Sequence, residues 1–407
     1  MVNANRVVHL NPTAALIAWL ILEGGDVPAA AAALSRRYRI GRAEASADAQ
    51  QVAETLEALA APDGACPVHD LDLELLPPFS QRPTAPYRMD LALTYRCNDA
   101  CAHCYNARPR DYPELETEAW KRILTQLREI GVPHICFTGG EPTLRRDLPE
   151  LVAHAQAQGQ VTGLLTNGRR LSDERFVESL AAAGLDHVQV TLESSRESVH
   201  DAMVGAPGAW KQSVAGIRNV LRSGLYLMTN TTLLRDNVDH LAETIDFAAA
   251  LGVPTIGCNA LIHSGHGARV GTGLPESSLP ALLQVARQRT EANGQRLIWY
   301  TPTQYCHFDP VQMELGVKGC TAALYNLCVE PDGEVIPCQS YYQSLGNLLH
   351  DTWDSIWNHE LALWLREHRY APEACQDCAV LAECGGGCPL LLPAQAPRAL
   401  VTPFAVS

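Results

Sequence analysis

The sequence predicts an α/β protein built around a parallel β-sheet, either an α/β barrel or an open sheet. The first observation is that short apolar segments alternate with amphipathic ones between residues 89 and 300, a pattern typical of βαβ units. The second is that this alternation ends after Tyr300, where a cysteine-rich region follows. The third is a separate helical pattern in the first 62 residues. A chain of 407 residues has room for two or three domains.

Composition and charge exclude several classes of function. The net charge is −14 and no cluster of lysines and arginines contradicts it, which argues against a nucleic-acid partner. The longest apolar run, residues 14–22, is too short to span a membrane, and no signal peptide is visible. Fourteen cysteines in a chain without a secretory signal indicate metal binding rather than disulfides. We therefore expect a soluble, cytoplasmic, metal-binding protein without a membrane partner.

The N-terminal region, residues 1–62, predicts a short strand followed by three helices. The strand runs from Arg6 to Leu10. Thr13 can cap a helix that continues to Leu22 and ends at a pair of glycines. The second and third helices are expected at 27–38 and 43–59. Residues 63–87 contain several prolines and no steady periodicity, which predicts a linker.

The central region, residues 88–300, predicts strands separated by helices. The strands are expected at 90–94, 134–138, 161–166, 187–192, 227–233 and 255–260, with 297–300 as a further candidate. Helices are expected between them, for example at 116–130, 173–183 and 210–223. In folds of this kind the chemistry gathers at the carboxyl ends of the strands. The motifs described next all lie at such ends.

Three cysteines, Cys97, Cys101 and Cys104, follow the first strand with the spacing C-x3-C-x2-C. Thiolates are soft ligands that suit iron–sulfur clusters or zinc. A cubane cluster has four iron corners, so three sulfurs leave one iron free to bind a group that is not protein. The alternative is a zinc site completed by His103 or a distant residue, although tetrahedral zinc sites usually contain two C-x2-C pairs.

A glycine-rich segment, Gly139-Gly140-Glu141-Pro142, follows the second strand. Two glycines allow a ligand to approach the backbone closely, and Glu141 can pair with an ammonium group. A plain glycine-rich turn is the alternative. Together with the cysteine loop one βα unit upstream, this segment resembles the radical S-adenosylmethionine (SAM) enzymes, whose loop reads C-x3-C-x-aromatic-C. In this chain His103 stands in the aromatic position.

This resemblance implies a set of site residues. Cys97, Cys101 and Cys104 would hold a SAM-binding [4Fe–4S] cluster. The residues that would orient the cofactor are Gly139, Gly140, Glu141, Asn167 of a T-N-G segment, and Glu193 at the end of the fourth strand, where relatives contact the cofactor ribose. The segment 200–205 matches the family motif H-D-x-x-R-G except that valine replaces arginine at Val204, so the resemblance implies no contact from that side chain. Cys66, Cys136 and Cys258 are interpreted as structural.

The C-terminal region contains two further groups of cysteines. Cys320 and Cys338 belong to a C-x12-G-x4-C pattern, and a C-x2-C-x5-C-x3-C pattern contains Cys375, Cys378, Cys384 and Cys388. These spacings resemble SPASM, the auxiliary-cluster extension of radical SAM enzymes that modify peptides. The resemblance implies a first auxiliary [4Fe–4S] cluster on Cys320, Cys338, Cys388 and one more residue. A second would use Cys375, Cys378 and Cys384, but the last cysteine of the family pattern is absent.

The fourth ligands of both auxiliary clusters are open. For the first cluster the candidates are Cys328 and Cys306. Residues 330–333, E-P-D-G, predict a three-residue hairpin loop that pairs Cys328 with Ile336 and places Cys328 on the same face as Cys338, which favours Cys328. For the second, residues 389–407 contain no Cys, His, Asp or Glu. Three possibilities follow for the second cluster. One of its irons is open, or Cys306 or Asp377 supplies the fourth ligand, or no cluster forms at this site. We favour an incomplete or openly coordinated cluster.

The N-terminal unit is similar to the peptide-recognition module of pyrroloquinoline-quinone biosynthesis. The resemblance rests on the strand, on the segment from Leu10 to Ile17 and on the small-residue spacing of the following helices. In that family a leader peptide adds a strand beside the sheet, here along Val7–Leu10. The chain begins at what corresponds to the family's third strand, which implies a truncated start or a degenerate module. The alternative is a helical cap without a ligand.

The resemblances together imply a partial (β/α)6 TIM-like barrel over residues 88–300. A winged-helix-like unit precedes it at 1–62, and an auxiliary-cluster domain follows at 301–407. The implied activity is reductive cleavage of SAM to a 5′-deoxyadenosyl radical that abstracts hydrogen from a substrate, with ferredoxin or flavodoxin as electron donor. The favoured substrate is a ribosomally synthesised peptide. The alternatives are a small-molecule enzyme such as those acting on tetrapyrrole side chains, or a zinc-holding scaffold that is not an enzyme.

Overall fold

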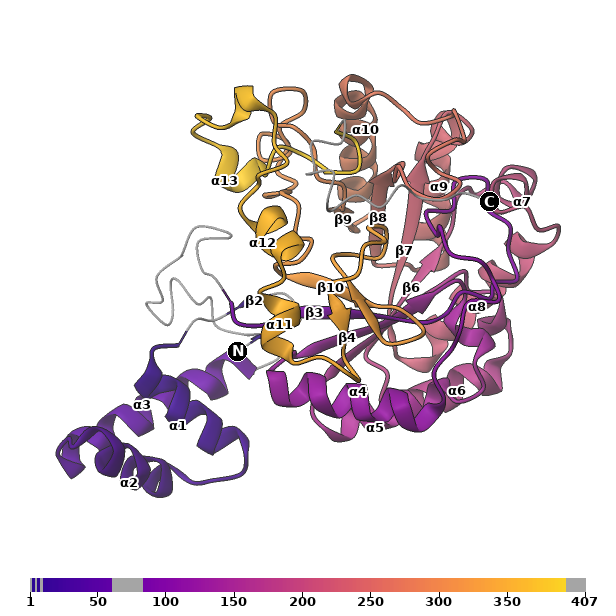
Figure 1. The fold of residues 1–407 in the computed structure, drawn as a ribbon. Coiled ribbons are helices and arrows are strands. Elements are labelled where there is room, and N and C mark those ends of the chain that lie inside the picture. The colour runs from indigo at the N-terminus through magenta and orange to yellow at the C-terminus, as the bar shows by residue number, and fades with distance from the viewer. Residues whose placement is uncertain (1, 4–5, 8–9, 61–82, 393–407) are drawn as a thin grey trace. The chain divides into compact units, whose positions relative to one another are not determined.

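A computed structural model describes residues 2–3, 6–7, 10–60 and 83–392 (Figure 1). The chain divides into two compact units, residues 1–80 and 81–407, and each is described here by itself. The predicted linker, 63–87, lies outside the described residues except for 83–87. Within the described ranges, every helix is too short or too polar to cross a lipid bilayer.

The N-terminal unit contains a two-stranded hairpin and three helices. Strand β1 (Val2–Asn3) pairs antiparallel with β2 (Arg6–Val7), while Val8 and His9 of the predicted strand lie outside the described residues. The helices are α1 (Pro12–Leu22), α2 (Val27–Tyr38) and α3 (Arg42–Ala60). Small alanines allow them to pack closely around Ile17 and Leu34, which are buried.

The cap of α1 differs from the prediction. Thr13 was the expected cap, but the side chain of Asn11 accepts a hydrogen bond from the amide of Ala14 at 2.8 Å. The reason is Pro12, which occupies the first helical position because its fixed φ suits a helix start and its missing N–H is not needed there. The capping residue is therefore the one before the proline.

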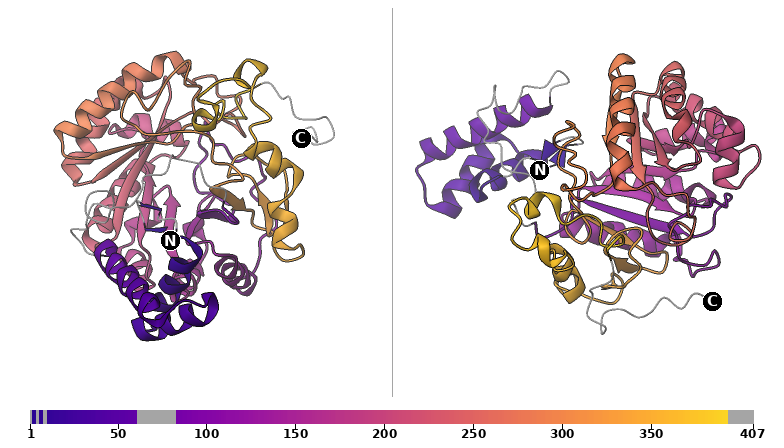
Figure 2. Two further views of the ribbon diagram at one scale, coloured as in Figure 1. Left: turned by 90° about the vertical axis from the view of Figure 1, so that its left-hand side faces the viewer. Right: turned by 90° about the horizontal axis from the view of Figure 1, so that it is seen from above.

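The second unit is organised around a ten-stranded, mostly parallel sheet (Figures 1 and 2). Seven parallel strands follow one another in chain order: β3 (Arg88–Thr94), β4 (His134–Gly139), β5 (Val161–Thr166), β6 (His187–Thr191), β7 (Tyr226–Leu233), β8 (Thr255–Ala260) and β9 (Arg296–Trp299). On the other side of β3 the sheet continues with β10 (Asn326–Val329), which is parallel to β3, and with the antiparallel β11 (Glu334–Ile336) and β12 (Gly346–Asn347). Because β9 and β12 are its edges, the sheet is open, and the predicted α/β class with a partial barrel is confirmed.

Helices follow the parallel strands and cover the sheet. They are α4 (Thr117–Ile130), α5 (Leu148–Ala157), α6 (Glu174–Ala182), α7 (Glu197–Val204), α8 (Ala209–Ser223), α9 (Leu241–Leu251) and α10 (Leu279–Ala292), followed in the C-terminal region by α11 (Trp353–Trp357), α12 (Glu360–Arg366) and α13 (Leu381–Cys384). Figure 1 shows α4, α5 and α6 side by side along one face of the sheet. The core between sheet and helices includes Leu91, Trp120, Ile135 and Phe137, all fully buried. Strands buried on both faces explain the continuous apolar runs of the sequence.

Two half-buried histidines form a pair at the amino ends of their strands, the edge opposite to the cysteine loop. His134 begins β4 and His187 begins β6, and their ring centroids are 5.1 Å apart. Burial and then the positive charge of Arg88 lower the pKa of His134 to about 3 and that of His187 to about 4. Gly163 makes room for the pair, because a Cβ there would lie 2.4 Å from the His187 ring. Both rings are therefore neutral at pH 7.

We predict that this pair makes the second unit less stable in mild acid. The unfolded chain binds protons on both rings below about pH 6.5, whereas the folded rings stay neutral until about pH 3–4, so this stability is complete above pH 6.5 and is lost as the pH falls. Each ring accounts for about 2 kcal/mol, so the free energy of unfolding of the double variant His134→Gln/His187→Gln should fall by roughly 4 kcal/mol less than that of the unaltered protein between pH 7 and pH 5. Urea unfolding at both pH values measures this difference. The exposed His350→Gln is the control, and equal losses in all three proteins would contradict the prediction.

Candidate functional site

The loop from Cys97 to Cys104 leaves the carboxyl end of β3. All three thiols are free and partly buried, and the amide of Asp99 donates to the Cys97 sulfur at 3.4 Å. Burial raises the pKa of Cys97 to about 12, although the Asp99 amide opposes this, and burial also raises the pKa of Cys101 and of Cys104. A metal that binds here must therefore displace protons from the thiols.

The three thiols of this loop do not form a ready site for a single ion. Within the described ranges, no three His, Cys, Asp or Glu side chains lie close enough together to hold one metal ion. Tetrahedral zinc would need its sulfurs about 2.3 Å from one centre. A cluster spreads its ligands over several metal atoms, so the loop fits a cluster better than zinc.

The G-G-E segment after β4 lies directly against the residues that precede Cys97. The amide of Gly140 donates to the Thr94 carbonyl at 2.7 Å, and the amide of Glu141 donates to the Arg96 carbonyl at 2.8 Å. A Cβ on Gly139 would lie 2.1 Å from the Thr94 oxygen, and one on Gly140 would lie 2.5 Å from the Arg96 oxygen. The sequence suggested that the glycines admit a ligand. In the structure they admit the protein's own backbone, which fixes the start of the cysteine loop.

The carboxylate of Glu141 is buried and hydrogen-bonded within the protein. Its Oε1 accepts from the amide and the hydroxyl of Thr143, at 3.0 and 2.6 Å, and from the Thr166 hydroxyl at 2.7 Å. Its Oε2 accepts from the Asn167 amide at 2.8 Å. Burial nevertheless raises the pKa of Glu141. A carboxylate accepts about four hydrogen bonds, so an ammonium group of a ligand has to compete with these donors. Glu141 thereby joins the ends of β4 and β5.

The T-N-G segment after β5 contacts the cysteine loop through side chains. The Asn167 amide group donates to Asn98 Oδ1 at 2.7 Å, and Arg169 forms an ion pair with the buried Asp99 at 2.7 Å. Asn167 was predicted from the sequence, whereas Arg169 and Asp99 were not. Their pairing could have been predicted from two features: an acidic residue lies inside the cysteine loop, and a basic residue lies two positions after Asn167. Both follow the ends of strands of one sheet.

Glu193, after β6, holds the cysteine loop from the other side. Its Oε1 lies 2.9 Å from His103 Nε2, and its Oε2 accepts from the Thr232 amide at 2.8 Å. Burial lowers the pKa of His103, but the Glu193 carboxylate outweighs this and raises the pKa above its usual value. The other ring nitrogen of His103, Nδ1, is buried and lacks a partner among the described residues. The histidine in the aromatic position therefore has one nitrogen fixed by Glu193 and one available to a ligand.

Helix α7 anchors the cysteine loop through its backbone. The carbonyls of Met203 and Val204 accept hydrogen bonds from the amides of Ala102 and Ala100, at 3.1 and 2.8 Å. The Val204 side chain is buried, and it points toward Ala206, Ala209 and the partly buried Cys101 rather than into solvent. Three strand ends and one helix thus converge on the loop that carries Cys97, Cys101 and Cys104.

The C-terminal region extends the same sheet. In the predicted hairpin, Cys328 pairs with Ile336 and the amide of Glu330 donates to the Glu334 carbonyl at 2.7 Å, so the predicted register is confirmed. Cys328 itself is buried among Ala92, Tyr95, Ile336 and Tyr342, and its thiol lies 3.7 Å from the Val329 carbonyl. Cys136 and Cys258 are buried in β4 and β8, and Cys66 lies outside the described residues.

The other C-terminal cysteines lie in two groups. Burial raises the pKa of Cys320, and the thiolates of Cys388 and Cys338 are the next largest causes. These three sulfurs therefore lie together. Cys375 and Cys378 lie in one turn, in which the Cys378 amide donates to the Cys375 carbonyl at 3.1 Å, and α13 ends at Cys384. These two groups are neighbours, because a Cβ on Gly385 would lie 3.3 Å from the Cys320 amide nitrogen.

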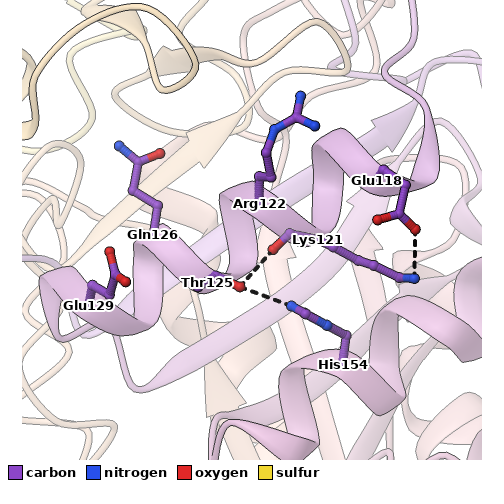
Figure 3. Close-up of a pocket in the computed structure, with 7 residues that line it drawn as sticks. All are labelled: Glu118, Lys121, Arg122, Thr125, Gln126, Glu129 and His154. Atoms are coloured by element: carbon purple, nitrogen blue, oxygen red, sulfur yellow. Dashed lines mark hydrogen bonds and ion pairs between the residues drawn. The ribbon is translucent and has the colours of Figure 1, made fainter.

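A surface pocket of about 340 Å³ lies elsewhere, on the outer face of α4 and α5 (Figure 3). Its lining is mostly charged, and several of these side chains are paired with one another or with a neighbour. Lys121 forms ion pairs with Glu118 and Glu150 at 2.8 and 2.5 Å, and Thr125 hydrogen-bonds His154 at 3.0 Å. These helices lie away from the strand ends that hold the cysteine loop, so we assign the pocket no part in the chemistry.

Three family models match the chain. They are the radical SAM superfamily over residues 91–248, the SPASM iron–sulfur cluster-binding domain over 320–379, and coenzyme PQQ synthesis protein D (PqqD) over 1–60. These matches confirm the three resemblances inferred from the sequence.

Solved structures share the fold. SuiB of Streptococcus suis, bound to its precursor peptide SuiA, is 16% identical with a TM-score of 0.71, and the match covers 94% of this chain and 90% of SuiB. SuiB bound to S-adenosylmethionine gives the same values. The enzyme anSMEcpe with bound AdoMet is 16% identical with a TM-score of 0.58, covering 74% of this chain and 88% of the other. At these identities the likeness shows a common fold.

We predict that Gly140→Ala loosens the cysteine loop. The new Cβ would lie 2.5 Å from the Arg96 oxygen and 2.6 Å from the Tyr95 oxygen, so the G-G-E segment must move away from the loop. Overpacking of this kind costs about 1–3 kcal/mol. We expect a lower Tm and faster loss of iron to a chelator after anaerobic reconstitution. Gly41→Ala is the control because nothing lies within 4 Å of its Cβ position. If the two variants keep iron equally well, the backbone contact does not support the loop.

Proposed function

We propose that this protein, a radical SAM enzyme with a SPASM domain and a PqqD-type unit, modifies a ribosomally synthesised peptide after translation. The family matches establish the enzyme class and its cofactors: SAM, a SAM-binding [4Fe–4S] cluster and auxiliary iron–sulfur clusters. When bound, these cofactors supply the reductive cleavage of SAM to a 5′-deoxyadenosyl radical that abstracts hydrogen from the substrate. A non-enzymatic zinc scaffold does not agree with these matches.

The observation that carries the proposal is the convergence of strand ends on the cysteine loop. We assign Cys97, Cys101 and Cys104 as ligands of the SAM-binding cluster. Three sulfurs leave one coordination site open, and the loop is held by hydrogen bonds on several sides. We assign to cofactor orientation the residues that surround it: Gly139, Gly140, Glu141, Asn167 and Glu193. Their role is to fix the loop and exclude water, while the cofactors carry the chemistry.

The auxiliary sites are assigned on the same basis. Cys320, Cys338 and Cys388 would hold the first auxiliary cluster, with Cys328 as the fourth ligand. The hairpin register supports this role, because Cys328 pairs with Ile336, two residues before Cys338. The second auxiliary site would use Cys375, Cys378 and Cys384.

A peptide substrate is supported by two comparisons. SuiB, which has the same fold over most of its length, is known with its precursor peptide bound, and anSMEcpe is known with bound AdoMet and a peptide. The PqqD-type unit would supply a place for a leader peptide, which would add a strand along Val7–Leu10. We also propose ferredoxin or flavodoxin as electron donor. The cytoplasm, where thiols stay reduced, suits the free cysteines of the described residues.

The triple variant of Cys97, Cys101 and Cys104 to Ala tests the proposed activity. We expect it to lose all formation of 5′-deoxyadenosine under dithionite and about four irons per chain, because no other loop among the described residues combines three thiols with the G-G-E segment. Cys136→Ala, at a buried strand position, is the control and should retain both. Undiminished formation of 5′-deoxyadenosine by the triple variant would contradict the assignment of these cysteines as cluster ligands.

Deletion of residues 1–62 tests the peptide proposal. Short peptides encoded beside the gene serve as probes, and their affinity is measured by fluorescence anisotropy. We expect binding to weaken at least tenfold, which corresponds to about 1.4 kcal/mol, while uncoupled cleavage of SAM continues because the cysteine loop lies in the second unit. Unchanged turnover of a cognate peptide after the deletion would show that the unit is only a cap.

A further inference from the structure

The second auxiliary site has three cysteines where a cubane has four iron corners. Cys375, Cys378 and Cys384 are the three, and the tail at 389–407 contains no Cys, His, Asp or Glu that could supply a fourth ligand. A further thiol, Cys306, is free and has no role in the sites described above. It lies in the turn after β9, nearly 70 residues upstream of Cys375 in sequence.

Hydrogen bonds hold the segment 303–306 against Cys384. The Tyr305 amide donates to the Cys384 sulfur at 3.3 Å, and the Cys384 thiol lies 3.6 Å from the Thr303 carbonyl. The Tyr305 hydroxyl accepts from the Lys318 amide at 2.9 Å and lies 3.5 Å from the Glu383 carbonyl. In Figure 1 the chain that follows β9 runs beside the end of α13. The backbone next to Cys306 is therefore fixed at the second auxiliary site.

The glycines around this contact confirm that the two segments touch. A Cβ on Gly387 would lie 3.0 Å from the Gln304 side chain, and a Cβ on Gly319 would lie 2.5 Å from the Glu383 carbonyl. The Gly387 contact is with the segment that carries Cys306, whereas the Gly319 contact is with the residue before Cys384. Close packing at Gly387 therefore adds to the hydrogen bonds that join the segment 303–306 to the region of Cys384.

Cys306 directly follows Tyr305, whose amide donates to the Cys384 sulfur at 3.3 Å, so Cys306 lies next to this set of cysteines. Partial burial raises the pKa of Cys375. The next cause is the thiolate of Cys306, which comes before the thiolates of Cys384 and Cys378, so Cys306 lies close to Cys375. Cys306 and Cys378 are exposed, Cys375 is partly buried, and Cys384 is buried. Cys306 and Cys378 thus lie on the solvent side of this set, and Cys384 lies on the protein side.

We propose that Cys306 is the fourth thiolate ligand of the second auxiliary cluster and completes the set formed by Cys375, Cys378 and Cys384. The fourth ligand would thus come from upstream, on the turn whose Tyr305 amide is bonded to Cys384. The inference rests on the cluster-holding function proposed above. Thiolate suits iron–sulfur clusters better than the carboxylate of Asp377, the other candidate identified from the sequence. The Tyr305 N–H that reaches the Cys384 sulfur would also donate to a bound thiolate, a contact that tunes cluster potentials.

The test is metal content after anaerobic reconstitution, followed by exposure to an iron chelator. The intact protein should hold about twelve irons per chain, four for each of three cubanes. Cys306→Ala should fall to about eight once the chelator is present, and Cys306→Ser should retain more because a serine oxygen can still ligate. Cys258→Ala, at a buried strand position, should stay at about twelve. Because Cys306 lies in an exposed turn, circular dichroism should show the same fold in every variant.

A second set of variants distinguishes loss of iron from this site and loss of iron from the first auxiliary site. In Cys375→Ala/Cys378→Ala, about eight irons should remain, and adding Cys306→Ala should remove no more. A further loss of about four irons would assign Cys306 to the first auxiliary site and overturn the proposal. So would loss of iron in Asp377→Asn but not in Cys306→Ala, or one zinc per chain that disappears with Cys306→Ala.

Failure of the inference and failure of the function give different results. About eight irons in the intact protein, unchanged by Cys375→Ala and by Cys306→Ala, with SAM cleavage retained, would show that only the second auxiliary site is empty. No iron and no 5′-deoxyadenosine from the intact protein would contradict the function as well. Retained SAM cleavage in Cys306→Ala, with about four irons released, supports the proposal because the SAM-binding loop is then intact.

Discussion

The buried carboxylate of Glu330 joins the barrel strands to the cysteine-rich region, and the arrangement of the cluster loops depends on it. It follows β10, the strand that pairs with β3, and Arg108 donates to both of its oxygens at 2.6 Å while the Tyr95 hydroxyl donates at 3.1 Å. The guanidinium also lies over the rings of Tyr112 and Tyr342, 5.2 and 5.3 Å from their centroids. Removing one partner of a buried ion pair costs roughly 3–5 kcal/mol, because the remaining charge stays buried. Since Arg108 lies just beyond the cysteine loop, this one pair fixes that loop against the auxiliary domain.

A second contact connects the same two regions closer to the sulfurs. The Tyr105 hydroxyl donates to Gln339 Oε1 at 2.6 Å, and the Gln339 amide group donates to the buried Asp90 at 2.6 Å. Tyr105 directly follows Cys104, and Gln339 directly follows Cys338. The loop that carries Cys97, Cys101 and Cys104 and the segment that carries Cys338 are therefore linked by one pair of hydrogen-bonded side chains. Their separation is set by side-chain length and by the register of β10 on β3, so it cannot vary as it would across a flexible linker.

Local physics explains which parts of this arrangement could be predicted from the sequence. The central strands were predicted almost to the residue because a parallel sheet buries both faces and leaves continuous apolar runs. The hairpin register at Cys328 could be predicted because four neighbouring residues determine the type of turn, and the turn sets the register. The cap of α1 was assigned to Thr13 because Pro12 was not read as the first helical residue. The donors to Glu141 were missed for another reason. Thr166 and Asn167 belong to the next βα unit, and only the folded sheet brings them to that carboxylate.

The departure at Val204 shows how a motif can change its side chain and keep its structural role. The carbonyls of Met203 and Val204 hold the amides of the cysteine loop, and every residue type has such a carbonyl. Valine in place of arginine therefore retains the anchor, and its side chain packs near Cys101 where a charged one would need a partner. Gly205 is different, because its φ of +63° favours glycine and a Cβ there would lie 2.5 Å from the Ala100 oxygen. Positions that act through their backbone tolerate substitution when space allows, whereas those that act through close approach do not, and a sequence pattern alone does not separate the two.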